Sequence, residues 1–326
     1  MYPNHIQLGQ SMTPIYKLKK LSQQLNKNIY IKREDYTGIE MSGNKVRKLE
    51  FALAEAIKES AEIIITCGAL QSNHARATVA AATQLGLKTH LVLRGEEQAH
   101  ANGNLLIDMI YDAEITYLSE EQFLHHEQVM NELKMNYAEQ GKNAYIIPIG
   151  ASNGIGNFGY VNVFNEITTQ EKELGINFDT IVCAIGSGGT YSGLVLGNKL
   201  SQMNKKIMGY SVGGSSKYFK SRCLNIIEES QKYLQASIDI HEQDIFIIDK
   251  YQGDGYAKTT ADDIRFIKNI AKLEGFVLDP VYTGKAFKGM YVDIEKGEYA
   301  DTQNVLFIHT GGIFGIGAFS EWFNMK

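Results

Sequence analysis

Short runs rich in β-branched residues alternate with longer helix-forming segments along most of this chain. EIIITC (62–67), THLVLR (89–94), EITYL (114–118) and NAYIIPIG (143–150) have the length and composition of buried strands. The segments between them are Ala-rich or amphipathic and are long enough to be crossover helices. Such crossovers form parallel sheets that are covered by helices on both faces. The pattern therefore predicts an α/β fold.

A second alternating unit follows the first. A helix is expected over residues 157–175, and DTIVCAIG (179–186), KIMGYSV (206–212), DIFIID (244–249) and NVLFIH (304–309) are expected strands of one sheet. An N-terminal strand, NIYIKRE, is expected to join this second sheet. With 326 residues the chain is long enough for two domains. We therefore predict two domains, each an open, twisted, mostly parallel sheet with helices on both faces.

Charge and cysteine usage narrow the class of protein. The net charge is −5 with both signs interspersed, which argues against a nucleic-acid-binding surface. Three scattered cysteines, Cys67, Cys183 and Cys223, provide neither a disulfide framework nor CxxC zinc spacing, so buried thiols and no metal site are expected. No signal-peptide layout and no 18-residue apolar stretch is present, so a cytoplasmic protein without a membrane anchor is expected.

AIGSGGTYSGL (184–194) is the strongest phosphate-binding pattern in the chain. Its glycines let the backbone approach a phosphate, and the loop leads into a predicted helix whose first N–H groups favour an anion. No GK[ST] sequence closes it, and Tyr191 stands at the third glycine position of a dinucleotide fingerprint. A strand-to-helix turn without a ligand remains the alternative interpretation.

Gly154, Gly156 and Gly159 match GxGxxG literally between a predicted strand and a predicted helix. Nicotinamide binding through this motif also requires an acidic residue at the end of the next strand. Asp179 has about the right spacing but precedes its strand, so it would lie at the wrong end of the sheet. A nicotinamide-dependent oxidoreductase is therefore disfavoured.

Polar clusters mark two other predicted helix starts. SGNKVRKLEF (42–51) places Lys45 and two further cations at a helix N-terminus, where positive charge is normally unfavourable. An anion or a carbonyl compound would explain them. In TCGALQSNHAR (66–76), Ser72, Asn73 and His74 either cap a helix or hold a carboxylate, and the pattern leaves both interpretations open.

Together these stretches resemble one known family. GNKVRKLEF, CGALQSNHAR, GSGGTYSGL, LDPVYTGKA and HTGG, in this order, are similar to the D-cysteine desulfhydrase and 1-aminocyclopropane-1-carboxylate (ACC) deaminase family of pyridoxal-phosphate (PLP) enzymes. The resemblance implies fold type II, as in the tryptophan-synthase β-subunit, and a homodimer. It also implies a larger PLP-binding domain (1–47 and 158–326), a smaller α/β domain (48–157) and an active site in the cleft between them.

The resemblance assigns roles residue by residue. Lys45 would form the Schiff base with the cofactor and, once freed, take the substrate's α-proton. The other implied cofactor-binding residues are Lys48, Asn73, Gly186, Ser187, Gly188, Gly189, Thr190, Thr283 and Thr310, the implied substrate-binding residues are Ser72, Asn73 and His74, and the implied active-site tyrosines are Tyr256 and Tyr282. Arg47, Lys48 and partial burial are expected to lower the pKa of Lys45.

Two positions bear on the reaction. Where ACC deaminases have a carboxylate and an apolar residue, this chain has Thr283 and Thr310, the pattern of D-cysteine desulfhydrases. A hydroxyl supports a weaker electron sink, which suits elimination of a good leaving group. We therefore expect α,β-elimination of D-cysteine to pyruvate, hydrogen sulfide and ammonia. ACC deamination, L-cysteate desulfonation and amino-acid or PLP binding without turnover remain alternatives. Tyr191, where close relatives are expected to have histidine, bears on substrate preference.

Overall fold

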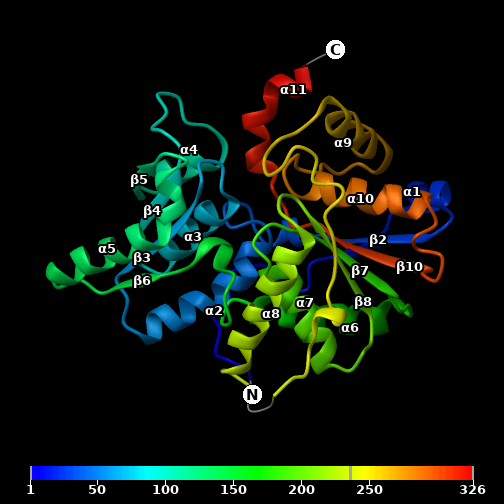
Figure 1. Cartoon of the computed structure of the whole chain (residues 1–326), viewed down its shortest axis with the longest axis horizontal. Helices are drawn as coiled ribbons and strands as arrows, with labels where there is room; N and C mark the ends of the chain where they lie inside the picture. The colour runs from blue at the N-terminus through cyan, green and yellow to red at the C-terminus, as the bar shows by residue number, and fades with distance from the viewer. Residues whose placement is uncertain (1, 235–236, 325–326) are drawn as a thin grey trace.

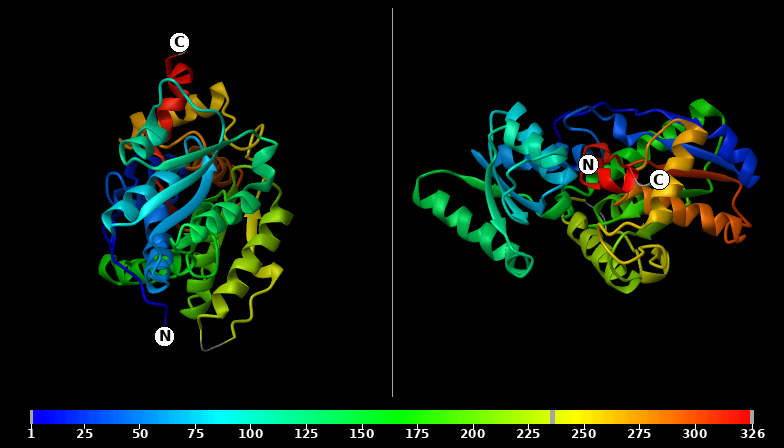
Figure 2. Two further views of the ribbon diagram at one scale, coloured as in Figure 1. Left: turned by 90° about the vertical axis from the view of Figure 1, so that its left-hand side faces the viewer. Right: turned by 90° about the horizontal axis from the view of Figure 1, so that it is seen from above.

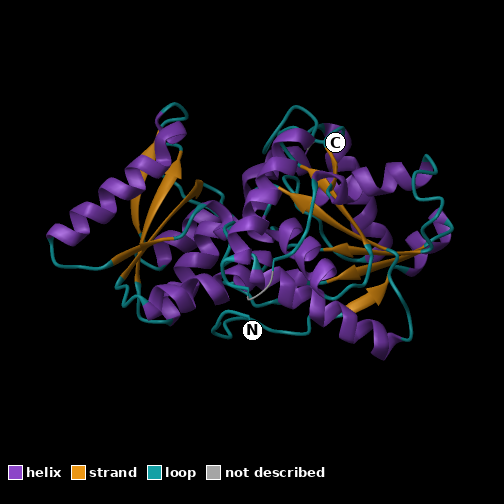
Figure 3. Cartoon of the chain, turned by 60° about the horizontal axis from the view of Figure 1, so that its bottom comes forward, coloured by secondary structure: helices purple, strands orange, loops and turns teal. Residues whose placement is uncertain are grey.

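A computed structural model describes residues 2–234 and 237–324, and its strands form two separate sheets. The four-stranded sheet lies on the left of Figure 1 and the six-stranded sheet on the right. Figure 3 shows helices packed between the two sheets as well as outside them. The two α/β units predicted from the sequence are therefore present.

The smaller sheet contains β3 (Ile63–Ala69), β4 (Lys88–Arg94), β5 (Glu114–Leu118) and β6 (Ala144–Ile146), in the order β5-β4-β3-β6. All of its pairings are parallel. Successive side chains of β3 face opposite sides, as the period of a strand requires. Ile63 and Ile65 pack in one core cluster with Met130, whereas Ile64 packs in another with Leu53.

The larger sheet contains β1 (Ile15–Lys17), β2 (Asn28–Lys32), β7 (Thr180–Ile185), β8 (Lys206–Ser211), β9 (Phe246–Ile248) and β10 (Asn304–Ile308), in the order β1-β2-β10-β7-β8-β9. The strand predicted at NIYIKRE does join it, pairing in parallel with β10. β1 pairs antiparallel with β2 and was not predicted. It has only three residues, too few to show a hydrophobic period.

Helices cover both faces of both sheets, as the turned views of Figure 2 show. The α-helices are α1 (Lys19–Leu25), α2 (Asn44–Lys58), α3 (Asn73–Gln84), α4 (Gly103–Ile110), α5 (His126–Glu139), α6 (Phe158–Leu174), α7 (Gly189–Leu200), α8 (Ser216–Gln231), α9 (Ala261–Glu274), α10 (Thr283–Glu295) and α11 (Ser320–Asn324). Short 3-10 turns are η1 (Glu34–Tyr36), η2 (Gln122–His125), η3 (Ile149–Ala151), η4 (Glu242–Asp244) and η5 (Ile313–Phe319).

The predicted domain boundary at residues 47/48 falls inside α2, which runs unbroken from one unit into the other. Two ion pairs fix the start of this helix to the larger unit. Arg47 Nε lies 3.1 Å from Glu34 Oε2, and Arg47 Nη1 lies 2.9 Å from Glu166 Oε1. Glu34 is fully buried, so this charge cluster is shielded from solvent. α2 is therefore a shared element whose register is set by the larger unit.

All three cysteines are free and buried, as predicted, and burial raises the pKa of the Cys67 thiol to about 12. Among the helices of residues 2–234 and 237–324, none combines the length and apolar character needed to span a membrane.

Candidate active site

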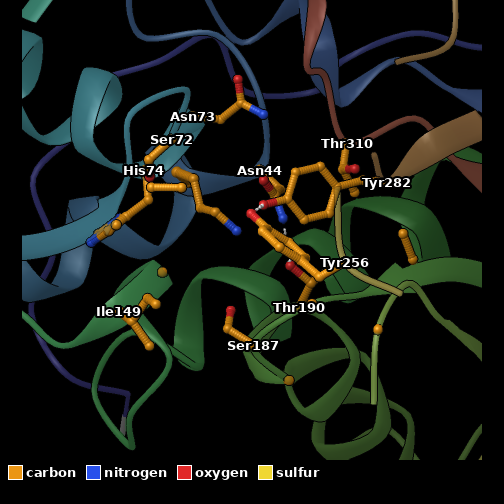
Figure 4. Close-up of a pocket in the computed structure, with 18 of the residues that line it drawn as sticks. Asn44, Ser72, Asn73, His74, Ile149, Ser187, Thr190, Tyr256, Tyr282 and Thr310 are labelled. Carbon is orange, nitrogen blue, oxygen red and sulfur yellow. Dashed lines mark hydrogen bonds between the residues drawn. The ribbon is translucent and has the colours of Figure 1, made fainter. Parts of the chain in front are cut away.

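A cavity of about 310 Å³ lies where the strands of both sheets end. Gly68 and Arg94 reach it from the smaller sheet, and Ala184 and Gly186 from the larger one. The predicted site residues that line it are Lys45, Ser72, Asn73, His74, Gly186, Ser187, Gly188, Thr190, Tyr256, Tyr282 and Thr310. Figure 4 shows many of these side chains around the cavity. Residues separated by up to 265 positions in the sequence thus converge at the carboxyl ends of the strands, where α/β folds bind ligands.

The start of α2 places Lys45 in this cavity. Gly43 precedes the helix with φ +99°, and a Cβ there would lie 2.7 Å from the carbonyl oxygen of Thr310. Asn44 N–H donates to that carbonyl oxygen (3.1 Å), and Asn44 Nδ2 donates to Thr190 Oγ1 (2.8 Å). The helix start is thereby tied to two loops of the larger unit, and the Lys45 side chain projects from it.

Burial lowers the pKa of Lys45 to about 8. Arg47 was expected to contribute, but the structure corrects this: its guanidinium is paired with Glu34 and Glu166 and does not line the cavity. The contact between the two lysines acts on Lys48, whose pKa is lowered well below its ordinary value by burial and then by the charge of Lys45. A pKa near 8 leaves a useful fraction of neutral amine at neutral pH.

Lys48 itself lies behind the cavity wall. Its ammonium donates to the carbonyl oxygen of Gly150 and to Ser152 Oγ, the latter at 3.1 Å. Ser152 Oγ in turn lies 2.8 Å from Ser187 Oγ and accepts from the N–H of Gly189 at 3.2 Å. Lys48 therefore reaches the glycine-rich loop through Ser152, where direct approach to a phosphate was expected. Gly189, also expected to contact the cofactor, gives its N–H to Ser152.

The glycine-rich loop joins β7 to α7 and forms one end of the cavity. Gly188 has φ +95° and precedes α7 with no side-chain cap. A Cβ on Gly186 would lie 2.9 Å from the Tyr282 ring. The first turn of a helix has N–H groups without intrahelical acceptors, and its dipole favours negative charge. The loop therefore has the geometry of an anion-binding site, and the absence of side chains at its glycines leaves room for the anion.

Ser72 and its neighbours form the opposite wall. Ser72 Oγ accepts from the N–H of Ala75 at 3.1 Å, so this residue caps α3 and lines the cavity at once. Asn73 Oδ1 accepts from Asn104 Nδ2 at 3.0 Å. Both interpretations of the Ser-Asn-His sequence are thus compatible: the cap orients the helix start whose N–H groups face the cavity.

His74 is buried, and its ring nitrogens contact the hydroxyl groups of Thr66 and Thr78. Nε2 lies 2.8 Å from Thr66 Oγ1, which itself donates to a carbonyl oxygen, so Nε2 carries the proton. Burial, followed by the charges of Lys45 and Lys48, lowers the pKa of His74 well below its ordinary value. His74 is therefore a neutral part of the wall.

Tyr256 and Tyr282 face each other through their hydroxyl groups, which hydrogen-bond to one another. Their ring planes are inclined by 69° with centroids 5.8 Å apart, and Figure 4 shows both hydroxyls directed into the cavity. Burial raises the pKa of both phenols, that of Tyr282 well above its ordinary value. Both tyrosines are therefore protonated at neutral pH and can donate a proton or a hydrogen bond.

The structure corrects the expectation for Thr283. Its hydroxyl donates to Asp279 Oδ1 at 2.7 Å, it is fully buried, and it does not line the cavity. Asp279 accepts further from the N–H groups of Val281, Tyr282 and Thr283. Thr283 thus stabilises the start of α10, and Thr310 is the threonine of the pair that lines the cavity.

Tyr191 and the GxGxxG glycines have structural explanations. The Tyr191 hydroxyl accepts from the N–H of Phe246 (2.7 Å) and lies 3.1 Å from the carbonyl oxygen of Ile207, bridging β8 and β9. A Cβ on Gly159 would lie 2.2 Å from the carbonyl oxygen of Arg47, so this glycine permits close packing of α6 on α2. Asp179 accepts from the N–H groups of Gln303 and Asn304 at the amino end of the larger sheet, opposite the strand ends that meet the cavity.

Comparison with known proteins identifies the family. The family described as "Pyridoxal-phosphate dependent enzyme" matches residues 6–311. The chain belongs to this family. A relative from Thermotoga maritima, provisionally named a 1-aminocyclopropane-1-carboxylate deaminase, is 42% identical over 97% of this chain and 98% of its own. The "Bifunctional D-cysteine desulfhydrase/1-aminocyclopropane-1-carboxylate deaminase, mitochondrial" of Arabidopsis thaliana is 38% identical over 96% of this chain and 80% of its own.

A solved structure supports the same assignment. The crystal structure of an ACC deaminase homologue superimposes with a TM-score of 0.89 at 37% identity, covering 98% of this chain and 95% of that one. The chain therefore has the fold type II architecture of PLP enzymes, and PLP is its cofactor, as the sequence motifs implied.

The cavity fits this cofactor. Lys45 would supply an amine whose pKa is lowered by burial for the aldehyde, and the first turn of α7 would supply N–H groups for the phosphate. No group of three or more potential metal ligands occurs among the described residues. Sequence reasoning missed Asn44, Arg94 and Phe123 as lining residues. Arg94 ends a strand, so the strand-end rule that located the other loops would have found it too.

Proposed function

We propose that this PLP-dependent enzyme is a lyase that catalyses α,β-elimination of D-cysteine. One molecule of water is consumed, and pyruvate, hydrogen sulfide and ammonia are released. The Cβ–S bond breaks with its electron pair on sulfur, and the α-proton is removed by a base of the protein. When bound, PLP withdraws electrons from Cα of the substrate.

One observation supports elimination in preference to ring opening. Among the described residues that line the cavity, none is aspartate or glutamate. The nearby carboxylate of Asp279 is occupied by Thr283 and by backbone N–H groups. Thr310 presents a hydroxyl, which cannot hold a proton on a pyridine nitrogen as a carboxylate does. A weaker electron sink suffices when a good leaving group departs, but is poorly matched to a cyclopropane ring.

The chain's own groups supply the remaining requirements. Lys45, with a pKa near 8, holds the cofactor and then removes the α-proton. The capped start of α3 at Ser72 binds the substrate carboxylate through its N–H groups. The protonated Tyr256–Tyr282 pair donates a proton to the departing sulfur. Burial favours the protonation states that these roles require, namely a neutral amine on Lys45 and protonated hydroxyl groups on Tyr256 and Tyr282.

The decisive experiment compares three substrates on purified, PLP-loaded protein. We expect sulfide and pyruvate in equal amounts from D-cysteine, less from L-cysteine, and no 2-oxobutyrate from ACC. Lys45→Ala is expected to abolish turnover and the absorbance band that borohydride removes from the wild type. Turnover of ACC without sulfide from D-cysteine would overturn the proposal in favour of the ACC deaminase named among the relatives, and a borohydride-sensitive band without any turnover would indicate a binding protein.

A further inference from the structure

Arg94 is a cationic residue of the cavity to which the proposed reaction gives no role. It is the last residue of β4 and pairs in register with Ala69 of β3, and both residues line the cavity. Its strand end therefore lies directly beside the strand that leads to Ser72. Ligands in open α/β sheets sit at this edge.

Two aromatic rings lie within cation–π distance of the Arg94 guanidinium. Its Cζ lies 5.9 Å from the centroid of the Tyr256 ring and 5.7 Å from that of Phe123, and both rings line the cavity. Tyr256 belongs to the larger unit, so Arg94 reaches across the cleft. Cation–π contacts help to orient a guanidinium without using its N–H donors.

No anion among the described residues satisfies the N–H donors of Arg94. Within residues 2–234 and 237–324, Arg94 forms no ion pair and donates no hydrogen bond, and no carboxylate lines the cavity. Other buried arginines of the chain are fully engaged, for example Arg47 with Glu34 and Glu166. An oriented, half-buried guanidinium without a partner is the arrangement expected of a site that receives an anion from a ligand.

The two anionic groups that the proposed reaction already requires bind elsewhere in the cavity and not at Arg94. The α7 start receives the phosphate of the cofactor, and the α3 start at Ser72 receives the substrate's α-carboxylate. We propose that Arg94 binds a third anionic group, carried on the side chain of the bound amino acid, so that the cavity favours amino acids with a carboxylate on Cβ. The proposal rests on the proposed function for the orientation of the substrate. The same guanidinium would stabilise the negative charge that develops on the sulfur of D-cysteine before the Tyr256–Tyr282 pair protonates it.

Binding of D-aspartate and D-asparagine to the PLP-loaded protein tests this inference. The two ligands have the same shape and differ by one side-chain charge, and their dissociation constants follow from spectral titration of the cofactor or from competition with D-cysteine. We expect D-aspartate to bind at least about tenfold more tightly, the range of one charge-assisted hydrogen bond. Arg94→Gln should reduce the ratio to about one, and Arg94→Lys should leave an intermediate ratio because charge is retained without the planar fork.

Arg265→Gln is the matched control, because Arg265 is an exposed arginine of α9 paired only with Asp262 on the same helix. Its ratio should equal that of the wild type. Equal weakening of both ligands by Arg94→Gln would show that Arg94 binds the α-carboxylate, and would overturn the proposal. So would a wild type that does not distinguish the ligands or binds neither. If the wild type prefers D-aspartate to D-asparagine as expected but releases no sulfide from D-cysteine, only the proposed function is overturned. Repeating the titration with L-aspartate and L-asparagine shows which enantiomer the cavity prefers.

Discussion

Gly159 of α6 lies against the backbone of Arg47 in α2, so closely that a Cβ at position 159 would approach the Arg47 carbonyl oxygen to 2.2 Å. This contact is two residues from Lys45. The absence of a side chain therefore sets the distance between the two helices and, through α2, the position of the amine in the cavity.

Replacement of Gly159 by alanine is expected to destabilise the protein by about 3 kcal/mol, because backbone atoms cannot yield as a flexible side chain can. Because the substitution would displace α2 and with it Lys45, the variant should also bind PLP more weakly. Urea unfolding and cofactor titration measure the two effects. Gly38→Ala is the control, since its Cβ would have no neighbour closer than 3.9 Å. The opposite outcome would be a wild type that binds a nicotinamide nucleotide and a Gly159→Ala variant that is stable but does not. It would support the nucleotide-binding interpretation of the GxGxxG sequence.

Ser152→Ala tests whether Lys48 acts on the glycine-rich loop through a serine. The substitution removes one acceptor of Lys48 and the partner of the Gly189 N–H. Losing these buried hydrogen bonds should weaken PLP affinity about tenfold and lower stability by about 1–2 kcal/mol. Titration of the apo protein with PLP measures the first effect. Ser221→Ala, on the exposed face of α8, should change neither quantity, and unchanged affinity in Ser152→Ala would remove Ser152 from the proposed role.

The pKa of Lys45 makes cofactor loading pH-dependent. Only the neutral amine attacks an aldehyde, and burial lowers its pKa to about 8. The rate of apo-protein reconstitution should therefore rise as the pH increases toward about 8 and level off above it. Stopped-flow absorbance at saturating PLP measures this rate. A rate that continued to rise toward the ordinary lysine pKa would indicate a solvated amine and would contradict the burial seen in the structure.

Tyr191→Phe tests whether the Tyr191 hydroxyl stabilises the fold or determines substrate preference. The hydroxyl serves backbone groups of Phe246 and Ile207, so its removal should cost about 2 kcal/mol of unfolding free energy. The ratio of kcat/KM between D-cysteine and alternative substrates should stay constant, because the hydroxyl is directed at the sheet. Tyr36→Phe is the control, since the Tyr36 hydroxyl is exposed and bonds to none of the described residues. A changed ratio at unchanged stability would assign Tyr191 to recognition.

The sequence predicted the strands, the crossover helices and the 186–190 loop because each has a local signal. Period-two and helical hydrophobic patterns, glycine runs and the family's motifs occupy contiguous residues. β1 and α1 were missed because three and seven residues are too few to show a period. Arg94 was overlooked although its place at the carboxyl end of a predicted strand was visible in the sequence.

The wrong predictions concern side chains whose hydrogen-bond partners could not be read from the sequence. The partner is either far away in the chain or a nearby residue that competes with the cofactor. Helical spacing placed Lys48 on the same face as Lys45, but its ammonium was taken by Gly150 and Ser152, about a hundred positions away. Thr283 was assigned to the cofactor, yet Asp279, four residues earlier, holds its hydroxyl. Proximity along the chain does not show which acceptor a donor selects in a packed interior.

The amino-acid order by itself determined the α/β class, the family and the cofactor, because these depend on patterns within short segments. Only the tertiary structure decided that Lys48 donates to Gly150 and Ser152, that Arg47 belongs to a buried ion cluster and that Arg94 lines the cavity without a counter-charge among the described residues. These outcomes depend on burial and on contacts between segments far apart in the chain, where desolvation determines which charges must be paired.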